Sequence, residues 1–114
     1  MPFLRVETNV EVADERRREL LGGLSSQVAS MLGKSEDYMM VMIEDGQALI
    51  FGASDRPSAF VALKSIGLDD SRTGSLSDVI CATLESQLGI PPERIYIEFS
   101  GAMGSMWGWN RQTF

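Results

Sequence analysis

The stretch Ser75–Ser100, SLSDVICATLESQLGIPPERIYIEFS, decides the fold because it holds a helix, the stop of that helix and the strand that follows. Ser75 and Asp78 have the spacing of a capping box, which predicts the helix start. Apolar residues at helical spacing predict one buried face: Leu76, Ile80, Leu84 and Leu88. Gly89 and the two prolines behind it predict the helix end, and the alternating RIYIEFS segment predicts a strand.

Working outward, the same order of elements occurs twice. SAFVALKSIG, at 58–67, predicts a strand before this helix. In the first half, MPFLRVETN alternates like a strand, with Phe3, Arg5 and Glu7 on one face and Leu4, Val6 and Thr8 on the other. A helix is then expected from an N-cap at Asp14 to Leu32, with Gly33 as its stop. YMMVMIEDGQALIFG, at 38–52, predicts two strands joined by a hairpin turn at Asp45–Gly46.

These elements predict a single domain over residues 1–114 made of two β-α-β halves, at about 1–56 and 57–114. A crossover helix between two strands implies parallel pairing in each half, so we expect an α/β two-layer sandwich. Strands such as MMVMI and FVAL are apolar on both sides, yet two helices cover only one face of a sheet. The second face therefore needs a partner, and another copy of the chain is the simplest one. The apolar tail, with Met106, Trp107, Trp109 and Phe114, either docks on a neighbour, covers a pocket or folds back on its own core.

Composition narrows the function. A formal charge of −6 and a pI near 4.5 argue against nucleic-acid binding and against an anionic membrane surface. No spanning segment or signal peptide is visible, so a cytoplasmic location is expected, with release by a non-classical route left open. Cys81 is alone and is expected to be a buried, inert thiol. Histidine is absent, so acid–base chemistry falls to carboxylates, Lys, Tyr or the amino terminus, and no metal or cofactor site is expected.

Five stretches then carry a resemblance: MPFLRVETNV, GKSEDYMMV, SIG, PPERIYIEF and GWNRQTF. In order and spacing they resemble the macrophage migration inhibitory factor family, which includes D-dopachrome tautomerase, over essentially the whole chain. The resemblance implies the tautomerase-superfamily fold, a four-stranded mixed sheet with two helices on one face. It also implies a homotrimer with active sites between subunits.

The resemblance gives Pro2 a role that its position at a strand start does not require. In the family the methionine is removed, and the N-terminal proline is the base that moves a proton next to a carbonyl. Burial and a nearby lysine lower the pKa of such an amine, so it can act as a base near neutral pH. While Met1 is attached, the Pro2 nitrogen is an amide without a basic lone pair, so we expect activity only after processing.

Further site residues follow from the resemblance. Lys34 matches the lysine that binds a substrate carboxylate or stabilises an enolate, although a lysine at a helix end also complements the helix dipole. The remaining matches are Ser65 and Ile66 in SIG, the pocket aromatics Tyr38 and Tyr96, with Tyr96 from the adjacent subunit, and the apolar wall of Trp109 and Phe114. Each has a plain structural reading as a core or rim residue.

Three departures from the family pattern affect the site. Glu98 stands where the inhibitory-factor branch has asparagine, and Trp107 stands where it has valine. Glu98 would repel an anionic substrate unless it is protonated or turned away, and Trp107 would narrow the pocket mouth. Ser58–Val61 replaces the C-x-x-C segment, which excludes thiol redox activity.

The sequence therefore predicts a keto–enol tautomerase acting on phenylpyruvate-like 2-oxo acids, with dopachrome isomerisation as a related activity. One alternative is a cytokine-like binding or signalling trimer with an unknown protein receptor and vestigial catalysis. Another is a superfamily decarboxylase or dehalogenase that uses Pro2 as an acid.

Overall fold

A computed structural model describes the whole chain, Met1 to Phe114. Its main elements are β1 (Pro2–Thr8), α1 (Asp14–Leu32), β2 (Met40–Glu44), β3 (Ala59–Ile66), α2 (Thr73–Leu88) and β4 (Ile95–Ala102), followed by the short strands β5 (Gly108–Trp109) and β6 (Gln112–Thr113). Neither helix is long and apolar enough to cross a membrane.

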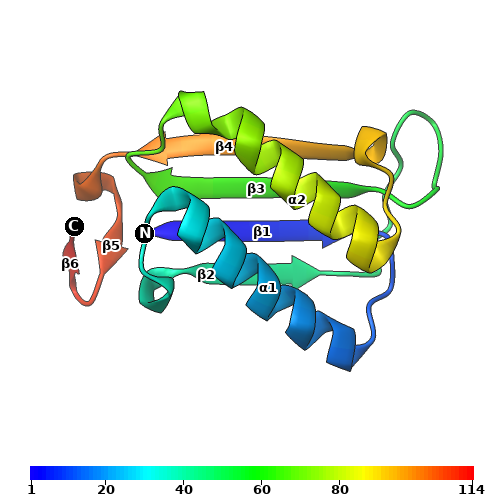
Figure 1. Ribbon diagram of the computed structural model, residues 1–114, viewed down its shortest axis with the longest axis horizontal. Coiled ribbons are helices and arrows are strands. Elements are labelled where there is room, and N and C mark those ends of the chain that lie inside the picture. Colours follow the sequence, from blue (N-terminus) through cyan, green and yellow to red (C-terminus); the bar gives the residue numbers. More distant parts are fainter.

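The four long strands form one mixed sheet in the order β2-β1-β3-β4. β1 pairs with β2 and β3 pairs with β4, both in parallel, whereas the two central strands β1 and β3 run antiparallel. Both helices lie on the same face of this sheet (Figure 1). The two-layer fold with a four-stranded mixed sheet is therefore confirmed.

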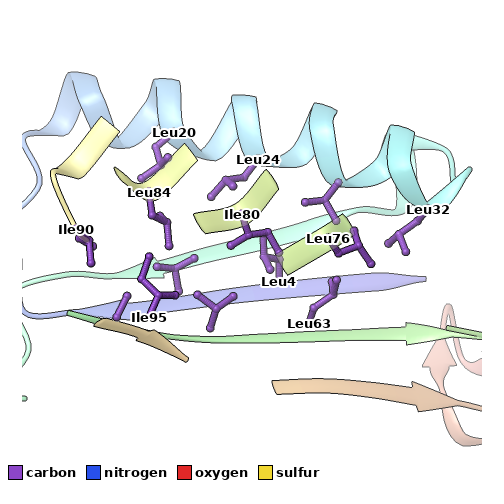
Figure 2. Close-up of a cluster of buried hydrophobic side chains, with 14 residues drawn as sticks. Leu4, Leu20, Leu24, Leu32, Leu63, Leu76, Ile80, Leu84, Ile90 and Ile95 are labelled. Carbon is purple, nitrogen blue, oxygen red and sulfur yellow. The ribbon is translucent and has the colours of Figure 1, made fainter. Parts of the chain in front are cut away.

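The core lies between the helices and the two central strands (Figure 2). Leu4 and Val6 of β1 and Leu63 of β3 are fully buried, and the inward residues of both helices cover them. These helix residues are Leu20, Leu24, Val28 and Leu32 of α1 and Leu76, Ile80 and Leu84 of α2. The apolar residues that recur at helical spacing in the sequence are thus the residues that fill the core between the helices and the sheet.

The opposite face of the sheet, here called the open face, carries no helix (Figure 1). Because side chains alternate along a strand, the residues next to the buried ones point to it. Met40 of β2 is 62% exposed and Tyr96 of β4 is 65% exposed. An ion pair between Arg5 and Glu7 on β1, with Nε and Oε1 3.2 Å apart, also lies there. A single protomer leaves this partly apolar face in water.

The hairpin expected at Asp45–Gly46 is wrong. β2 is followed by a segment that hydrogen-bonds the end of β1: the amide of Gly46 donates to Val10 O at 3.0 Å and that of Gln47 donates to Thr8 O at 2.9 Å. The Asp45 carboxylate accepts hydrogen bonds from Val12 N at 2.8 Å and from Arg17. Asp45 therefore tethers the connection from β1 to α1 instead of starting a turn, because β2 is already paired in parallel with β1.

Both predicted helix starts also need correction. The N-cap position of α1 is Ala13, without a side-chain cap, and Asp14 lies in the first turn, where it pairs with Arg17. Helix α2 begins at Thr73 because a 3-10 turn, Asp70–Arg72, leads straight into it, so Ser75 lies inside the helix and forms no capping box. The ends at Gly33 and Gly89 are confirmed, with φ of 65° and 69° in the left-handed region.

The C-terminal tail folds back across the end of the sheet at which β1 begins (Figure 1). β5 and β6 form a small hairpin, and the Phe114 amide donates to Gly104 O at 3.2 Å and to Trp107 O at 3.3 Å. A Cβ added at Gly104 would lie 2.6 Å from Phe114 O. Residue 104 must therefore be glycine for the tail to close.

Arg94, only 5% exposed, organises the loop between β2 and β3. Its guanidinium donates to the carbonyl oxygens of four loop residues and to one hydroxyl, at 2.9 to 3.1 Å: Phe51, Ser54, Arg56, Pro57 and Ser58 Oγ. It also lies 5.3 Å from the centroid of the Phe51 ring. The Phe51 ring in turn packs against Tyr96, with centroids 4.6 Å apart. Arg94 thus links this loop to β4.

Candidate active site

A cavity of about 440 Å³ opens where β1 begins and the tail crosses the sheet. It is lined by Met1, Pro2, Phe3, Asp37, Tyr38, Met39, Met40, Lys64, Trp107, Gly108, Trp109 and Phe114. Eight of these twelve residues are hydrophobic, which suits the flat apolar body of an aromatic ligand. Five of the residues that the sequence suggested for the site meet here: Pro2, Tyr38, Trp107, Trp109 and Phe114.

Aromatic rings from two segments build one wall of the cavity. Tyr38 ends the 3-10 turn Glu36–Tyr38, which begins where the Ser35 hydroxyl accepts a hydrogen bond from the Asp37 amide. Its ring meets Trp109 edge-on at 5.6 Å between centroids. Trp109 stacks on Phe114, with centroids 5.4 Å apart and planes 17° apart. The three rings therefore pack against one another along one side of the cavity.

Pro2 lines the cavity from the start of β1. It is buried, it is the first residue of β1, and it stands opposite Ser65 of β3 in the sheet register. In the unprocessed chain the free amine belongs to Met1, and burial, followed by repulsion from the Lys34 ammonium, lowers the pKa of that amine. At the start of β1, therefore, an amine loses its proton more readily than in water.

Lys34, Ser65 and Ile66 line an adjoining hollow of about 260 Å³, with Leu32, Gly67, Leu68, Asp69 and Arg72. The Lys34 amide donates to Ala29 O at 2.9 Å, which closes the end of α1 and fixes where this side chain begins. Its ammonium has no carboxylate within ion-pair distance, since the three ion pairs of the chain involve only Arg5 and Arg17 as cations. Lys34 is thus available to an anionic ligand.

Tyr96 and Glu98 do not join this cavity within one protomer. Both lie exposed on the open face of β4, where Glu98 stands beside Ala62 of β3 in the register. The resemblance assigned Tyr96 to the site of an adjacent subunit. Within one chain, β1, β3, the turn after α1 and the tail line the cavity and the adjoining hollow without these two side chains.

Sequence reasoning missed several lining residues, of which Lys64 and Asp37 are charged. Lys64 stands directly before Ser65, and it neighbours Phe3 in the register, so the pairing of β1 with β3 brings it to the cavity. The strand alternation could have indicated this position, because Leu63 and Ser65 read as inward residues. Asp37 stands directly before Tyr38 and could have been found by the same proximity.

Metal-binding groups do not converge in this chain. No group of three or more His, Cys, Asp or Glu side chains is close enough together to hold a metal ion. Burial in α2 raises the pKa of the half-buried Cys81 thiol, which makes it a poor nucleophile at neutral pH. The ionisable groups and hydroxyls at the cavity are the terminal amine, the Lys64 ammonium, the Asp37 carboxylate and the Tyr38 hydroxyl. The adjoining hollow adds those of Lys34, Ser65, Asp69 and Arg72.

Comparison with known proteins agrees with this geometry. A sequence model described as macrophage migration inhibitory factor (MIF) matches residues 1–114. The chain belongs to the macrophage migration inhibitory factor family. A homologue of that factor from Trichinella spiralis is 37% identical over 115 residues, covering 100% of both chains. The factor of Mus musculus is 32% identical over 115 residues, covering 100% of this chain and 99% of the mouse protein.

Solved structures of the macrophage migration inhibitory factor family share the whole fold. The homologue from Prochlorococcus marinus superimposes with a TM-score of 0.93 at 39% identity, covering 98% of each chain. The family is tautomerase-like, so the chain is a tautomerase-superfamily protein and, at the level of enzyme class, an isomerase. Proteins of this family are typically oligomeric.

Proposed function

We propose that the chain, once Met1 is removed, is a keto–enol tautomerase of phenylpyruvate-like 2-oxo acids with Pro2 as the general base. The observation that carries this proposal is the position of Pro2: buried at the start of β1, facing an aromatic-walled cavity, with the unpaired ammonium of Lys34 near the chain terminus. An amine, a cation and an apolar wall are the three groups that this reaction needs.

The reaction transfers one proton twice. The neutral secondary amine of Pro2 takes a proton from C3 of the 2-oxo acid, and the C–H electrons form the C2–C3 double bond while the carbonyl π electrons move to oxygen. The protonated amine of Pro2 then gives this proton to the enolate oxygen, which yields the enol and the neutral amine, and the reverse sequence restores the ketone. Burial and Lys34 already lower the pKa of the Met1 amine, and the same two causes act on a terminal amine at Pro2, one residue deeper.

Each of the two hollows binds a different part of the substrate. The carboxylate and the developing enolate lie toward Lys34 and the backbone N–H of Ile66, where a cation stabilises the charge that grows in the transition state. The aromatic ring lies against Tyr38, Trp109 and Phe114, whose rings already pack against one another. Because Pro2 stands beside Ser65 in the sheet, the amine lies at the junction of the two hollows.

A homotrimer would complete this site. The open face exposes Met40 and Tyr96, which an additional subunit would cover, and oligomers are typical of the family. In that assembly Tyr96 and Glu98 of one subunit would reach the cavity of the next. Glu98 would then weaken the binding of a simple arylpyruvate, and Trp107 would restrict its entry, so we expect modest turnover of phenylpyruvate.

The test is phenylpyruvate tautomerisation, followed by ultraviolet absorbance, on protein whose terminal Pro2 has been verified by intact mass. Pro2→Gly keeps a terminal amine but replaces the rigid secondary amine, and it should lower kcat/KM by about 10² to 10⁴. Unprocessed protein that keeps Met1 is the matched control, because its Pro2 nitrogen is an amide. Equal rates for all three proteins would overturn the proposal. Dissociation into monomers in sedimentation experiments would overturn the trimer.

A further inference from the structure

We propose that Lys64 determines substrate specificity by binding a second anionic group, so that the preferred substrates are aromatic 2-oxo acids with a carboxylate at the far end of the ring. This inference rests on the proposed function, because it takes the first carboxylate to lie at Lys34.

The first observation is where the lysines are. The sequence contains eight arginines but only two lysines, Lys34 and Lys64. Lys34 lines the smaller hollow and Lys64 lines the aromatic cavity, so both lysines lie at the two hollows that meet at Pro2. The other cation at these hollows, Arg72, is engaged, since its Nη1 donates to Met31 O at 2.7 Å. The free ammonium groups of the chain are therefore concentrated at the site.

The second observation is that the two lysines approach Pro2 from opposite faces of the sheet. Lys34 follows the end of α1, which lies on the helix face. Lys64 is exposed, whereas its neighbours Leu63 and Ser65 are fully buried beneath the helices, so Lys64 points to the open face beside Phe3. A ligand held at Lys34 and passing Pro2 therefore meets Lys64 on the other side.

The third observation is that Lys64 has no ion partner within its own protomer. The ion pairs of the chain join Arg5 to Glu7, and Arg17 to Asp14 and Asp45. An unpaired ammonium at an apolar cavity attracts an anion more strongly than one in open water, because the surrounding rings lower the local dielectric. Lys64 is thus suited to a ligand carboxylate, and the aromatic wall suits a ring between the two charges.

Two carboxylates oppose this reading: Asp37 within the protomer and, in the proposed homotrimer, Glu98 of the adjacent subunit. The Asp37 carboxylate lines the same cavity, and it is exposed and not paired with Lys64. A dianionic ligand would be repelled by Asp37, whereas a ligand with a positive end would be attracted to it. Removing this carboxylate therefore distinguishes the two kinds of ligand, since Asp37→Asn should tighten binding of a dianion and weaken binding of a cation.

The experiment compares 4-carboxyphenylpyruvate with 4-methylphenylpyruvate, which has a similar shape but no second charge. Both tryptophans of the chain, Trp107 and Trp109, line the cavity, so quenching of their fluorescence reports binding even where turnover is slow. At low ionic strength we expect the carboxylate compound to bind about tenfold more tightly, and to have a higher kcat/KM by the same factor. The preference should shrink in 0.5 M salt.

Three variants identify the residue responsible. Lys64→Met keeps the length of the side chain and should abolish the preference, whereas Lys64→Arg keeps the charge and should retain it. Arg18→Met is the matched control, because it removes one exposed positive charge on α1, outside both hollows. Equal binding of the two compounds to the wild-type protein, or a preference that survives Lys64→Met, would overturn the inference. Absence of turnover with every compound would instead refute the tautomerase proposal, and the fluorescence titration would still decide the role of Lys64.

Discussion

Arg94 offers a test of how the loop between β2 and β3 is held. Its guanidinium is nearly buried and has no carboxylate partner, so four carbonyl oxygens, one hydroxyl and the Phe51 ring surround its charge. Arg94→Met keeps most of the apolar stem but removes every donor. The loop carbonyls then lose their partners, and Phe51 loses one of the two groups that fix its ring.

The magnitude follows from counting donors. Four N–H groups serve the five acceptors, because Nη2 has two hydrogens for three of them. Hydrogen bonds from a charged group contribute about 1.5 kcal/mol or more each, but burying a guanidinium without a counter-charge offsets part of that sum. We expect Arg94→Met to cost about 3 kcal/mol, which for a chain of this length lowers Tm by about 12 °C. Arg94→Lys should cost about 2 kcal/mol, since a single ammonium reaches fewer of the acceptors.

Thermal unfolding at one fixed protein concentration measures both variants, because the stability of an oligomer depends on concentration. Ile50→Ser, in the same loop, is the control: Ile50 is 73% exposed and should change Tm little. A drop of less than about 3 °C for Arg94→Met would refute the reasoning, because it would mean that water replaces the guanidinium without loss.

Three further outcomes are expected. Lys34→Gln removes the ammonium that helps to lower the pKa of the Met1 amine and, on the proposed mechanism, that of the Pro2 amine in the processed protein. The acidic limb of the pH profile of kcat/KM should therefore move to higher pH, and a move to lower pH would contradict this. Trp107→Val should widen the cavity and raise kcat/KM for phenylpyruvate several-fold without lowering Tm, and a lower kcat/KM would show that Trp107 binds the substrate instead. The hydrogen bond from the Val12 amide, and then that from Arg17, hold the pKa of Asp45 below its ordinary 3.8. The ionised carboxylate therefore stabilises the fold above pH 3.8. This stabilisation is lost as the pH falls through the lower pKa of the folded protein. Asp45→Asn should flatten the fall of the urea midpoint below about pH 4, and an unchanged slope would assign the fall to other groups.

The sequence predicted the elements that bury a regular face. The spacing of Leu76, Ile80 and Leu84 and the stop at Gly89 correspond to α2 and its end, because core packing and local propensity agree there. The prediction from sequence was wrong where a tertiary contact overrides the local turn propensity. Asp45–Gly46 has the composition of a hairpin turn, but the Asp45 side chain bonds the connection between β1 and α1. No local pattern contains the position of Val12, so the error was unavoidable at that level.

In the candidate site, too, local patterns predicted some residues, and tertiary pairing decided others. The position of Pro2 at the start of a strand was readable from alternation, and its neighbours in the tail were named from the resemblance. Lys64 was missed because it is one exposed residue on a strand whose importance depends on the pairing of β1 with β3. In the proposed homotrimer, the side chains that an adjacent subunit would add to the site depend on the assembly, and the single chain does not contain that geometry.

Both ends of the chain lie at the same end of the sheet, beside one cavity (Figure 1). Neighbouring termini usually invite circular permutation, because a short linker can join them without strain. Here such a linker would turn the Pro2 nitrogen into a tertiary amide while leaving the sheet, the helices and the aromatic wall in place. On the proposed mechanism, a permutant opened in an exposed loop at the opposite end would be a folded protein with an intact pocket and no base. Such a protein would show which activities of the family fold need only its folded surface and pocket, and which need the basic amine of Pro2.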